Sequence, residues 1–204
     1  LNILFGCVKL KSLSIDGAES VRGLEFSDVN TLENLWPLLN SFSANSLINI
    51  PQYMFYKFTN IDNISLDSVT EIPESTLTGT SIVTADFPSV TKLSDYAFLD
   101  CSALKNVALD NVISIGKDVF NGCSELKSLS LNSLKDIPSF EGFVYKFSDC
   151  DRLETVSLNS LVVANDNLFE GCASLKNVSM DALEIIPAYF FYSCSALETV
   201  SLDS

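Results

Sequence analysis

Apolar residues recur along this chain in a frame of fixed spacing that is longer than the period of a single helix or strand. The frame reads Phe-x-x-Cys-x-x-Leu-x-x-Val-x-Leu, and the stretch from Phe169 to Met180 shows it clearly. Five successive copies begin at Phe98, Phe120, Phe147, Phe169 and Phe191, which are 22, 27, 22 and 22 residues apart. A constant period in this range is typical of proteins built from stacked repeats.

Four weaker copies precede these five, because other residues replace the Phe or the Cys. The pairs in the two positions are Leu4 and Cys7, Glu33 and Trp36, Phe55 and Phe58, and Thr76 and Gly79. Insertions lengthen two repeats, one within residues 22–32 and one around residues 139–146. In a stacked-repeat protein such insertions form loops on one side.

Within each copy, the second half alternates between apolar and polar residues and predicts a short strand with one buried face. A later apolar residue is followed by Gly or Pro, as in Ile115-Gly116, and a following proline disfavours helix at the residue before it. The next few residues can form at most one short helical turn. A unit of about 22 residues cannot bury its apolar positions alone, so the units must stack. We therefore predict one solenoid domain over residues 1–204, with about nine coils.

The repeat resembles the BspA-type leucine-rich repeat, also called the Treponema pallidum type. Ile115-Gly116 and the segment from Ala97 to Leu104 carry the resemblance best. It implies an α/β repeat solenoid, a right-handed leucine-rich-repeat superhelix with a parallel, concave β-sheet and short helical or turn segments on the convex side. It also implies an extracellular or cell-surface protein of a host-associated bacterium or parasitic protist, which adheres to host proteins or to other cells and has no catalytic activity.

Charge and composition narrow the possible functions. Acidic residues outnumber basic ones by 26 to 12, giving a formal charge of −14, which argues against binding to nucleic acid or to anionic membranes. No apolar run reaches the roughly 18–20 residues that span a bilayer, and no signal peptide is recognisable. The chain begins without Met inside a repeat, so we expect it to be a piece of a longer polypeptide. It contains no histidine, the commonest general base and a frequent metal ligand. We expect neither enzyme activity nor a cofactor or metal.

Two repeated positions of the frame hold residues that could form disulfides or bind metal ions. One repeated position holds all six cysteines, which are Cys7, Cys101, Cys123, Cys150, Cys172 and Cys194. Trp36 and Phe58 take the same position in other copies, so we favour buried free thiols, with a disulfide as the alternative. The other column places Asp or Asn after each strand, at Asp16, Asn45, Asp67, Asp110, Asn132, Asn159, Asp181 and Asp203. Stacked carboxylates could bind Ca²⁺, but we favour capping of turn N–H groups.

The outward strand residues form a third column, made mostly of serines and flanked by charged residues. We predict a partner-binding face from Lys105, Asn106, Lys127, Ser130, Glu154, Ser157, Lys176, Asn177 and Ser179. Small residues would equally suit a crowded concave surface that binds nothing. The insertion supplies a second candidate contact, Phe140, Phe143 and Tyr145, because exposed aromatic residues are frequent in interface hot spots. These aromatic residues could instead form local core.

The sequence thus favours a non-catalytic adhesion or protein-binding module, expected to be monomeric, whose concave face binds a host matrix or plasma glycoprotein or another cell surface. The alternative is a structural spacer that displays another domain away from the cell.

Overall fold

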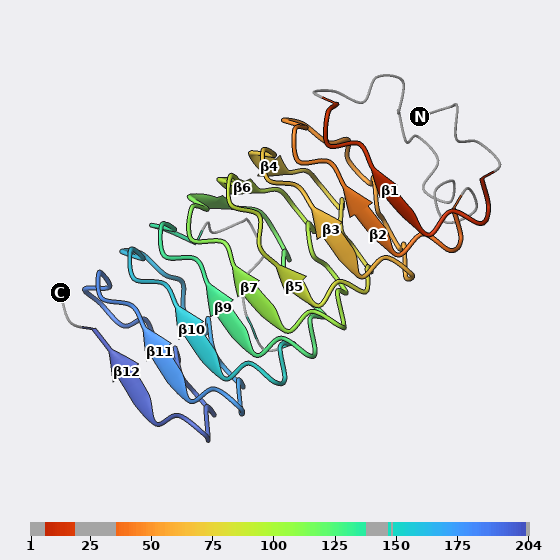
Figure 1. The fold of residues 1–204 in the computed structure, drawn as a ribbon. Coiled ribbons are helices and arrows are strands. Elements are labelled where there is room, and N and C mark those ends of the chain that lie inside the picture. Colours follow the sequence, from red (N-terminus) through yellow and green to blue (C-terminus); the bar gives the residue numbers. More distant parts are fainter. Residues whose placement is uncertain (1–6, 19–35, 138–146, 148, 203–204) are drawn as a thin grey trace.

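A computed structural model describes residues 7–18, 36–137, 147 and 149–202. The chain winds into a stack of coils, and each coil adds one short strand to a parallel sheet along one side (Figure 1). These strands are β1 (Ser12–Ser14), β2 (Ser41–Ser43), β3 (Asn63–Ser65), β5 (Thr84–Ala85), β7 (Asn106–Ala108), β9 (Ser128–Ser130), β10 (Thr155–Ser157), β11 (Asn177–Ser179) and β12 (Thr199–Ser201). The predicted parallel-sheet repeat solenoid is confirmed.

A second, smaller parallel sheet lies on another side of the stack. It contains β4 (Glu71–Ile72), β6 (Lys92–Leu93) and β8 (Ser114–Ile115) in that order. Pro73 after β4 and Gly116 after β8 predicted extended backbone there, and the structure shows that these segments pair with β6, which Ser94 follows.

The core consists of ladders of equivalent apolar residues. The central residue of each regular strand points inward, as do Val107, Leu129 and Val156, which are 2–3% exposed. The Phe positions of successive coils form one of these ladders, which we call the Phe ladder: the rings of Phe98 and Phe120 stack with centroids 5.5 Å apart. Phe147, Phe169 and Phe191 continue the stack, each with its ring centroid 6.5, 5.4 and 5.8 Å, respectively, from that of the preceding Phe.

The described segments around the Phe ladder are turns, and in six coils the backbone is left-handed at two positions. Around Phe98 these positions are Tyr96 (φ 60°) and Asp100 (φ 57°), two residues before and two residues after the Phe. The same pairing recurs at Tyr53 and Lys57, Ser75 and Gly79, Asp118 and Gly122, Asn167 and Gly171, and Tyr189 and Ser193. A right-handed helical turn needs φ near about −63°. Of the predicted short helical or turn segments, the structure therefore shows turns: the described residues contain no helix, and hence none suited to crossing a membrane.

The fourth copy fits the frame one residue later than predicted. Leu77 rather than Thr76 takes the Phe position, since it is fully buried and its carbonyl oxygen accepts a hydrogen bond from Cys101 Sγ at 3.0 Å. Thr80 rather than Gly79 takes the Cys position, and its hydroxyl lies 3.5 Å from Cys101 Sγ. The segment from Thr80 to the start of β5 is one residue shorter than the equivalent segment from Cys101 to the start of β7. The main sheet is interrupted at this coil, because β3 and β5 do not pair.

Truncating the Phe ladder should destabilise the stack strongly. Phe120 is 1% exposed and lies between two other rings, so Phe120→Ala should lower the free energy of unfolding by about 3–5 kcal/mol, as measured by urea unfolding. The control is Tyr192→Ala, because Tyr192 is 60% exposed and its loss should cost about 0.5 kcal/mol or less. Equal effects of the two variants would contradict the ladder.

Gly116 marks a close approach between two coils. A Cβ atom there would lie 2.5 Å from the backbone nitrogen of Asp95 and 2.7 Å from the carbonyl carbon of Ser94. We expect Gly116→Ala to lower the free energy of unfolding by about 1–3 kcal/mol, because backbone must move to admit the methyl group. Gly17→Ala is the matched control, since no atom lies within 4 Å of a Cβ at that position. A Gly116 variant as stable as the Gly17 variant would show that the coils are packed less closely.

Candidate functional site

The outward face of the main sheet carries a shallow depression across five consecutive strands. We call it the sheet groove; it is lined by residues 106–108, 128–130, 155–157 and 177–179 together with Thr199 and Ser201, and its volume is about 370 Å³. The central residue of each regular strand is turned into the core, so the residues on either side of it form two outward rows. The two rows differ in which hydrogen-bond donors and acceptors are still available to a ligand.

In the row at the strand ends, each serine donates its hydroxyl proton to the Asp or Asn side chain of the preceding coil. Ser130 Oγ donates to Asp110 Oδ1 at 2.5 Å, and Ser157 Oγ donates to Asn132 Oδ1 at 2.6 Å. Ser179 and Ser201 bond in the same way to Asn159 and Asp181. The hydroxyl protons of this row are therefore engaged within the protein. The serine oxygens remain as acceptors, and that of Ser130 already accepts one hydrogen bond, from Asn132 Nδ2 at 3.0 Å.

The Asp and Asn column caps the neighbouring coil as well. Asp110 Oδ1 also accepts the backbone N–H of Asn132 at 3.1 Å, and Asn132 Oδ1 accepts that of Asn159 at 3.2 Å. In Asp16, the Ser43 hydroxyl, followed by the Asn45 backbone N–H, lowers the pKa of the carboxyl. The predicted capping is thus present, but the capped group belongs to the next coil. The described residues contain no group of three or more potential ligands placed to hold a metal ion.

In the row at the strand starts, several donors remain available. Asn106 Oδ1 accepts a hydrogen bond from Ser128 Oγ at 2.9 Å, and Asn177 Oδ1 accepts one from Thr199 Oγ1 at 2.6 Å. The amide nitrogens of both asparagines and the hydroxyl of Thr155 have no hydrogen-bond partner among the described residues. This row therefore presents N–H and O–H groups to the groove.

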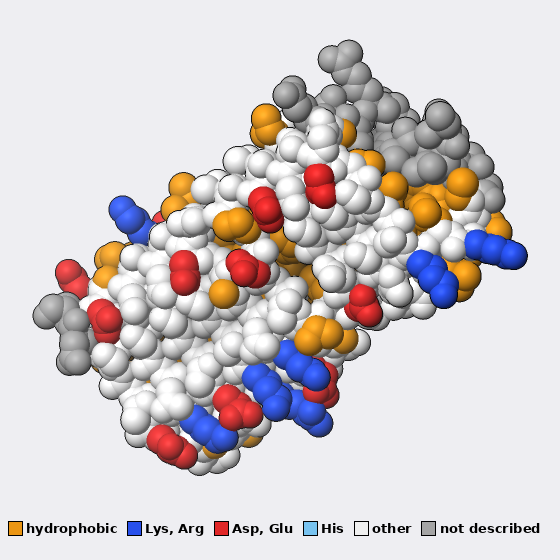
Figure 2. All heavy atoms as spheres, viewed as in Figure 1, with side chains coloured by type: hydrophobic (Ala, Val, Ile, Leu, Met, Phe, Trp, Pro, Cys, Tyr) orange, Lys and Arg blue, Asp and Glu red, His pale blue; other side chains and the backbone are white. Residues whose placement is uncertain are grey.

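A charged column borders the groove immediately before the strands. It contains Lys105, Lys127, Glu154, Lys176 and Glu198, and the N–H of each residue donates to the carbonyl oxygen of the one before it at 2.8–2.9 Å. We call this column the strand-start margin. Figure 2 shows lysine and arginine side chains gathered along the lower edge of the face that Figure 1 presents.

The two halves of the strand-start margin differ electrostatically. Lys176 Nζ forms an ion pair with Glu154 at 2.8 Å, which raises the pKa of Lys176 and lowers that of Glu154. Lys105 and Lys127 form no salt bridge with any described residue. Among the described residues, two neighbouring ammonium groups therefore have no salt-bridge partner at the β7 and β9 end of the groove, although the charge of Lys127 helps to lower the pKa of Glu154.

The structure brings together all nine residues predicted for the partner-binding face, and their binding role stays a prediction. The aromatic residues of the insertion, Phe140, Phe143 and Tyr145, lie outside the described residues, as do Leu4 and Glu33. Sequence reasoning missed Ser128, Thr155 and Thr199, although the alternation about each buried strand residue indicates that they point outward.

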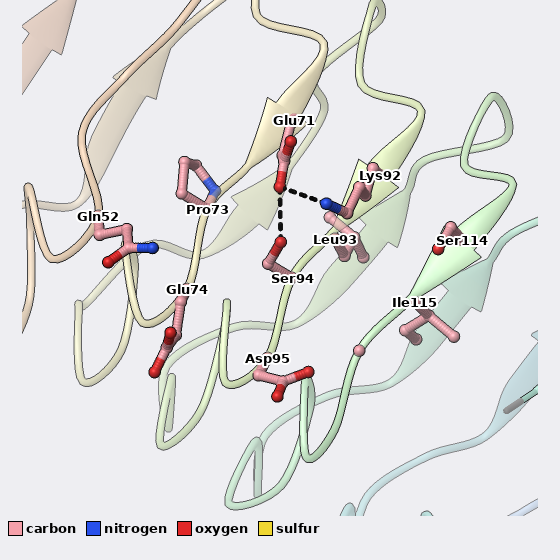
Figure 3. Close-up of a pocket in the computed structure, with 11 residues that line it drawn as sticks. Gln52, Glu71, Pro73, Glu74, Lys92, Leu93, Ser94, Asp95, Ser114 and Ile115 are labelled. Carbon is pink, nitrogen blue, oxygen red and sulfur yellow. Dashed lines mark hydrogen bonds and ion pairs between the residues drawn. The ribbon is translucent and has the colours of Figure 1, made fainter. Parts of the chain in front are cut away.

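A second depression, of about 530 Å³, lies beside β4, β6 and β8 (Figure 3). Its acidic groups already have partners. Glu71 forms an ion pair with Lys92 at 2.8 Å and accepts a hydrogen bond from Ser94 at 2.7 Å, and these bonds, that of Lys92 first, lower the pKa of Glu71. Glu74 accepts a tyrosine hydroxyl at 3.2 Å, and Asp95 accepts a backbone N–H at 2.9 Å. The arrangement links neighbouring coils and offers no free carboxylate cluster.

The cysteine column is part of the core, with two exceptions. Cys101, Cys123, Cys150 and Cys172 are buried free thiols, as predicted. Their Sγ atoms donate to carbonyl oxygens of the Phe ladder position in the preceding coil, as from Cys123 to Phe98 at 3.2 Å. Cys194 is only half-buried and Cys7 is exposed, so the prediction of burial is wrong for Cys7. All six are free thiols, and no disulfide forms.

The buried thiols should be unreactive until the protein unfolds. Burial raises the pKa of Cys101 to about 11 and that of Cys172 to about 12. With Ellman's reagent at pH 8, the native protein should expose the thiol of Cys7, whereas the four buried thiols should react only in denaturant. Fast reaction of every thiol in the native protein would contradict the buried column.

The same shifts predict a loss of stability at alkaline pH. An unfolded thiol ionises near its ordinary value of 9.0, so above that pH the unfolded state binds fewer protons than the folded state. The free energy of unfolding should be unaffected by these groups below about pH 9. Above that pH it should decrease, up to about pH 11 through Cys101 and up to about pH 12 through Cys172. Urea unfolding across this range measures the decrease, and Cys101→Ser should reduce it.

The family follows from the repeat itself. Six copies of the BspA type leucine rich repeat region match residues 2–105, 30–143 and 143–204, which is nearly the whole chain. The chain belongs to the BspA-type leucine-rich repeat family. The resemblance inferred from the segment around Ile115-Gly116 and Ala97 to Leu104 is thereby confirmed.

Solved structures of other leucine-rich repeat proteins are similar to this BspA-type chain. The leucine-rich repeat protein of T. pallidum has 26% identity and a TM-score of 0.51, over 78% of this chain and 65% of that one. One from Eubacterium ventriosum has 23% identity and a TM-score of 0.51, over 80% and 55%. A leucine rich cell surface protein from Faecalibacterium prausnitzii has 20% identity and a TM-score of 0.38, over 80% and 59%. The chain thus spans less than two thirds of the length of these proteins. No curated protein matches it.

Proposed function

We propose that this chain is the protein-binding part of a cell-surface or secreted adhesin, and that it holds its partner in the sheet groove. The groove carries the proposal: five strands align small side chains, all polar except Ala108, in two rows, beside a column in which two lysines form no salt bridge with a described residue. A volume of about 370 Å³ falls within the usual range of binding sites. Membership of the BspA-type family supports a surface location and a role without catalysis.

The chemistry of the groove favours a protein partner. The formal charge of −14 opposes nucleic acid, because phosphate backbones are bound by clusters of Lys and Arg that far exceed two residues. The described lining of the groove contains no aromatic side chain, so it offers no flat apolar surface on which a sugar ring could stack. Rows of hydroxyl and amide groups instead match the alternating donors and acceptors of a polypeptide backbone.

The spacer hypothesis remains the competing explanation of the same surface. The strand-end serines support it, because their bonds to the Asp and Asn column explain those residues without any partner. The two hypotheses differ on whether filling the groove changes the binding of the protein to its target.

Filling the groove with a large side chain should abolish partner binding. Ala108 lies in the groove with its side chain exposed and forms no side-chain hydrogen bond, so Ala108→Trp adds bulk without breaking a polar contact. We expect the wild-type protein to bind at least one immobilised matrix or plasma glycoprotein saturably, with fibronectin and fibrinogen tested first, in the presence or absence of calcium. The variant should bind at least about tenfold more weakly, because the indole ring would fill the β7 end of the groove and exclude the partner from it.

Ala188→Trp is the matched control, since Ala188 is also exposed but lies in the turn segment that leads to the Phe ladder. It should bind like the wild type. If the wild type bound none of the glycoproteins at micromolar concentration, or if both Trp variants bound equally well, the spacer hypothesis would replace this proposal.

A further inference from the structure

The two rows of the sheet groove have opposite hydrogen-bonding character, and this asymmetry limits what can bind there. At the strand ends, the protons of Ser130, Ser157 and Ser179 are already donated to the Asp and Asn column, so this row accepts. At the strand starts, the amide nitrogens of Asn106 and Asn177 are available, so this row donates.

The charges beside the groove follow the same division, with positive charge beside the donating row and negative charge beside the accepting row. Behind the donating row stand Lys105 and Lys127, which no described carboxylate neutralises by a salt bridge. Behind the accepting row stand the oxygen atoms of the Asp and Asn column, with carboxylates at Asp110 and Asp181. A ligand that fits both sides must present acceptors and negative charge to the first side, and donors to the second.

The length of the groove fits an extended peptide that crosses the strands. Five strands with a spacing of about 4.8 Å cover about 19 Å along the stack, which equals roughly six residues of extended chain at about 3.3 Å each. In such a segment successive side chains point to opposite sides, while backbone N–H and C=O groups are available on both edges. The small groups of the groove floor allow the backbone to approach closely.

We propose that the sheet groove binds an extended acidic segment of a partner protein, which runs along the stack with one or two carboxylate side chains directed at Lys105 and Lys127. The backbone carbonyl groups of the segment accept from the amide groups of Asn106 and Asn177, and its N–H groups donate to the serine oxygens. This inference rests on the proposed function and adds the chemistry of the partner. The charge pattern of the margin also positions the segment, because Lys176 is already paired with Glu154, and Glu198 repels carboxylates at the β12 end.

The test asks whether reversing the charge of the two lysines reverses the preference of the protein between acidic and basic peptides. The labelled protein is applied to an array of hexapeptides in which Glu, Gln or Lys occupies alternate positions, while the other positions carry each of the remaining amino acids in turn. We expect the wild-type protein to prefer Glu peptides and to lose this preference as salt is raised, since the lysines are exposed to solvent. The double variant Lys105→Glu/Lys127→Glu should reduce binding of Glu peptides at least about tenfold and should prefer Lys peptides.

Two further variants separate a local effect from a change in net charge or in folding. Lys135→Glu makes the same charge change at an exposed lysine outside the groove and should alter Glu-peptide binding less than about twofold, whereas Lys127→Glu should weaken it clearly. Lys105→Gln/Lys127→Gln removes the charge without introducing repulsion, and should abolish the preference while the circular dichroism spectrum stays unchanged.

The possible failures can be told apart. If Ala108→Trp abolishes glycoprotein binding but the array shows no preference for Glu, or a preference that the lysine variants leave intact, this inference is overturned and the proposed function stands. If the wild type binds neither glycoproteins nor any peptide, both are overturned.

Discussion

The stacking of each coil directly on the next is the constraint on which the other features of this structure depend. Backbone hydrogen bonds between consecutive coils fix it on two sides: the N–H of Lys127 donates to the carbonyl of Lys105 at 2.8 Å beside the sheet, and the N–H of Phe98 donates to that of Val119 at 3.0 Å in the turns. Each residue therefore lies about one strand spacing from its equivalents in the neighbouring coils. Residues at one position of the repeat therefore form a ladder along the stack. Each of them must pack against the residues at the same position in the coils on either side.

This constraint acts differently on apolar and polar ladders. Phe rings stack on Phe rings, so repetition improves the packing of the core. Identical charges at one strand spacing would repel one another, and the exposed columns accordingly mix residue types, as in the alternation of Lys127, Glu154 and Lys176. The serine and Asp or Asn columns meet the same demand by bonding donors of one coil to acceptors of another. Lys105 and Lys127 depart from this pattern, because they are neighbours of like charge.

The fold was predictable from the sequence wherever the repeat was regular, because the period of 22 residues alone determines which residues stack. The predicted register was wrong at Leu77 and Thr80, because the polar Thr80 takes the position that Cys holds in other coils and hydropathy no longer marks it. The absence of helix was not predictable, since left-handed backbone at Tyr96 or Asp100 leaves no reliable signal in residue type. For the candidate site, the period predicted which residues share a face. The direction in which the Ser130 proton points depends on side-chain geometry, and the division of the groove into donor and acceptor rows follows from it.

An acidic partner for a protein of charge −14 needs a physical account, because the two molecules repel each other at long range. At physiological ionic strength the Debye length is about 8 Å, so exposed charges more than two coils away are largely screened. A carboxylate in contact with Lys105 and Lys127 therefore responds to these two ammonium groups and little to the rest of the chain. Electrostatic steering would not accelerate the encounter, whereas contact would still discriminate between acidic and basic segments. Such a site selects its ligand after collision, by the length of an extended segment and by the placement of its charges.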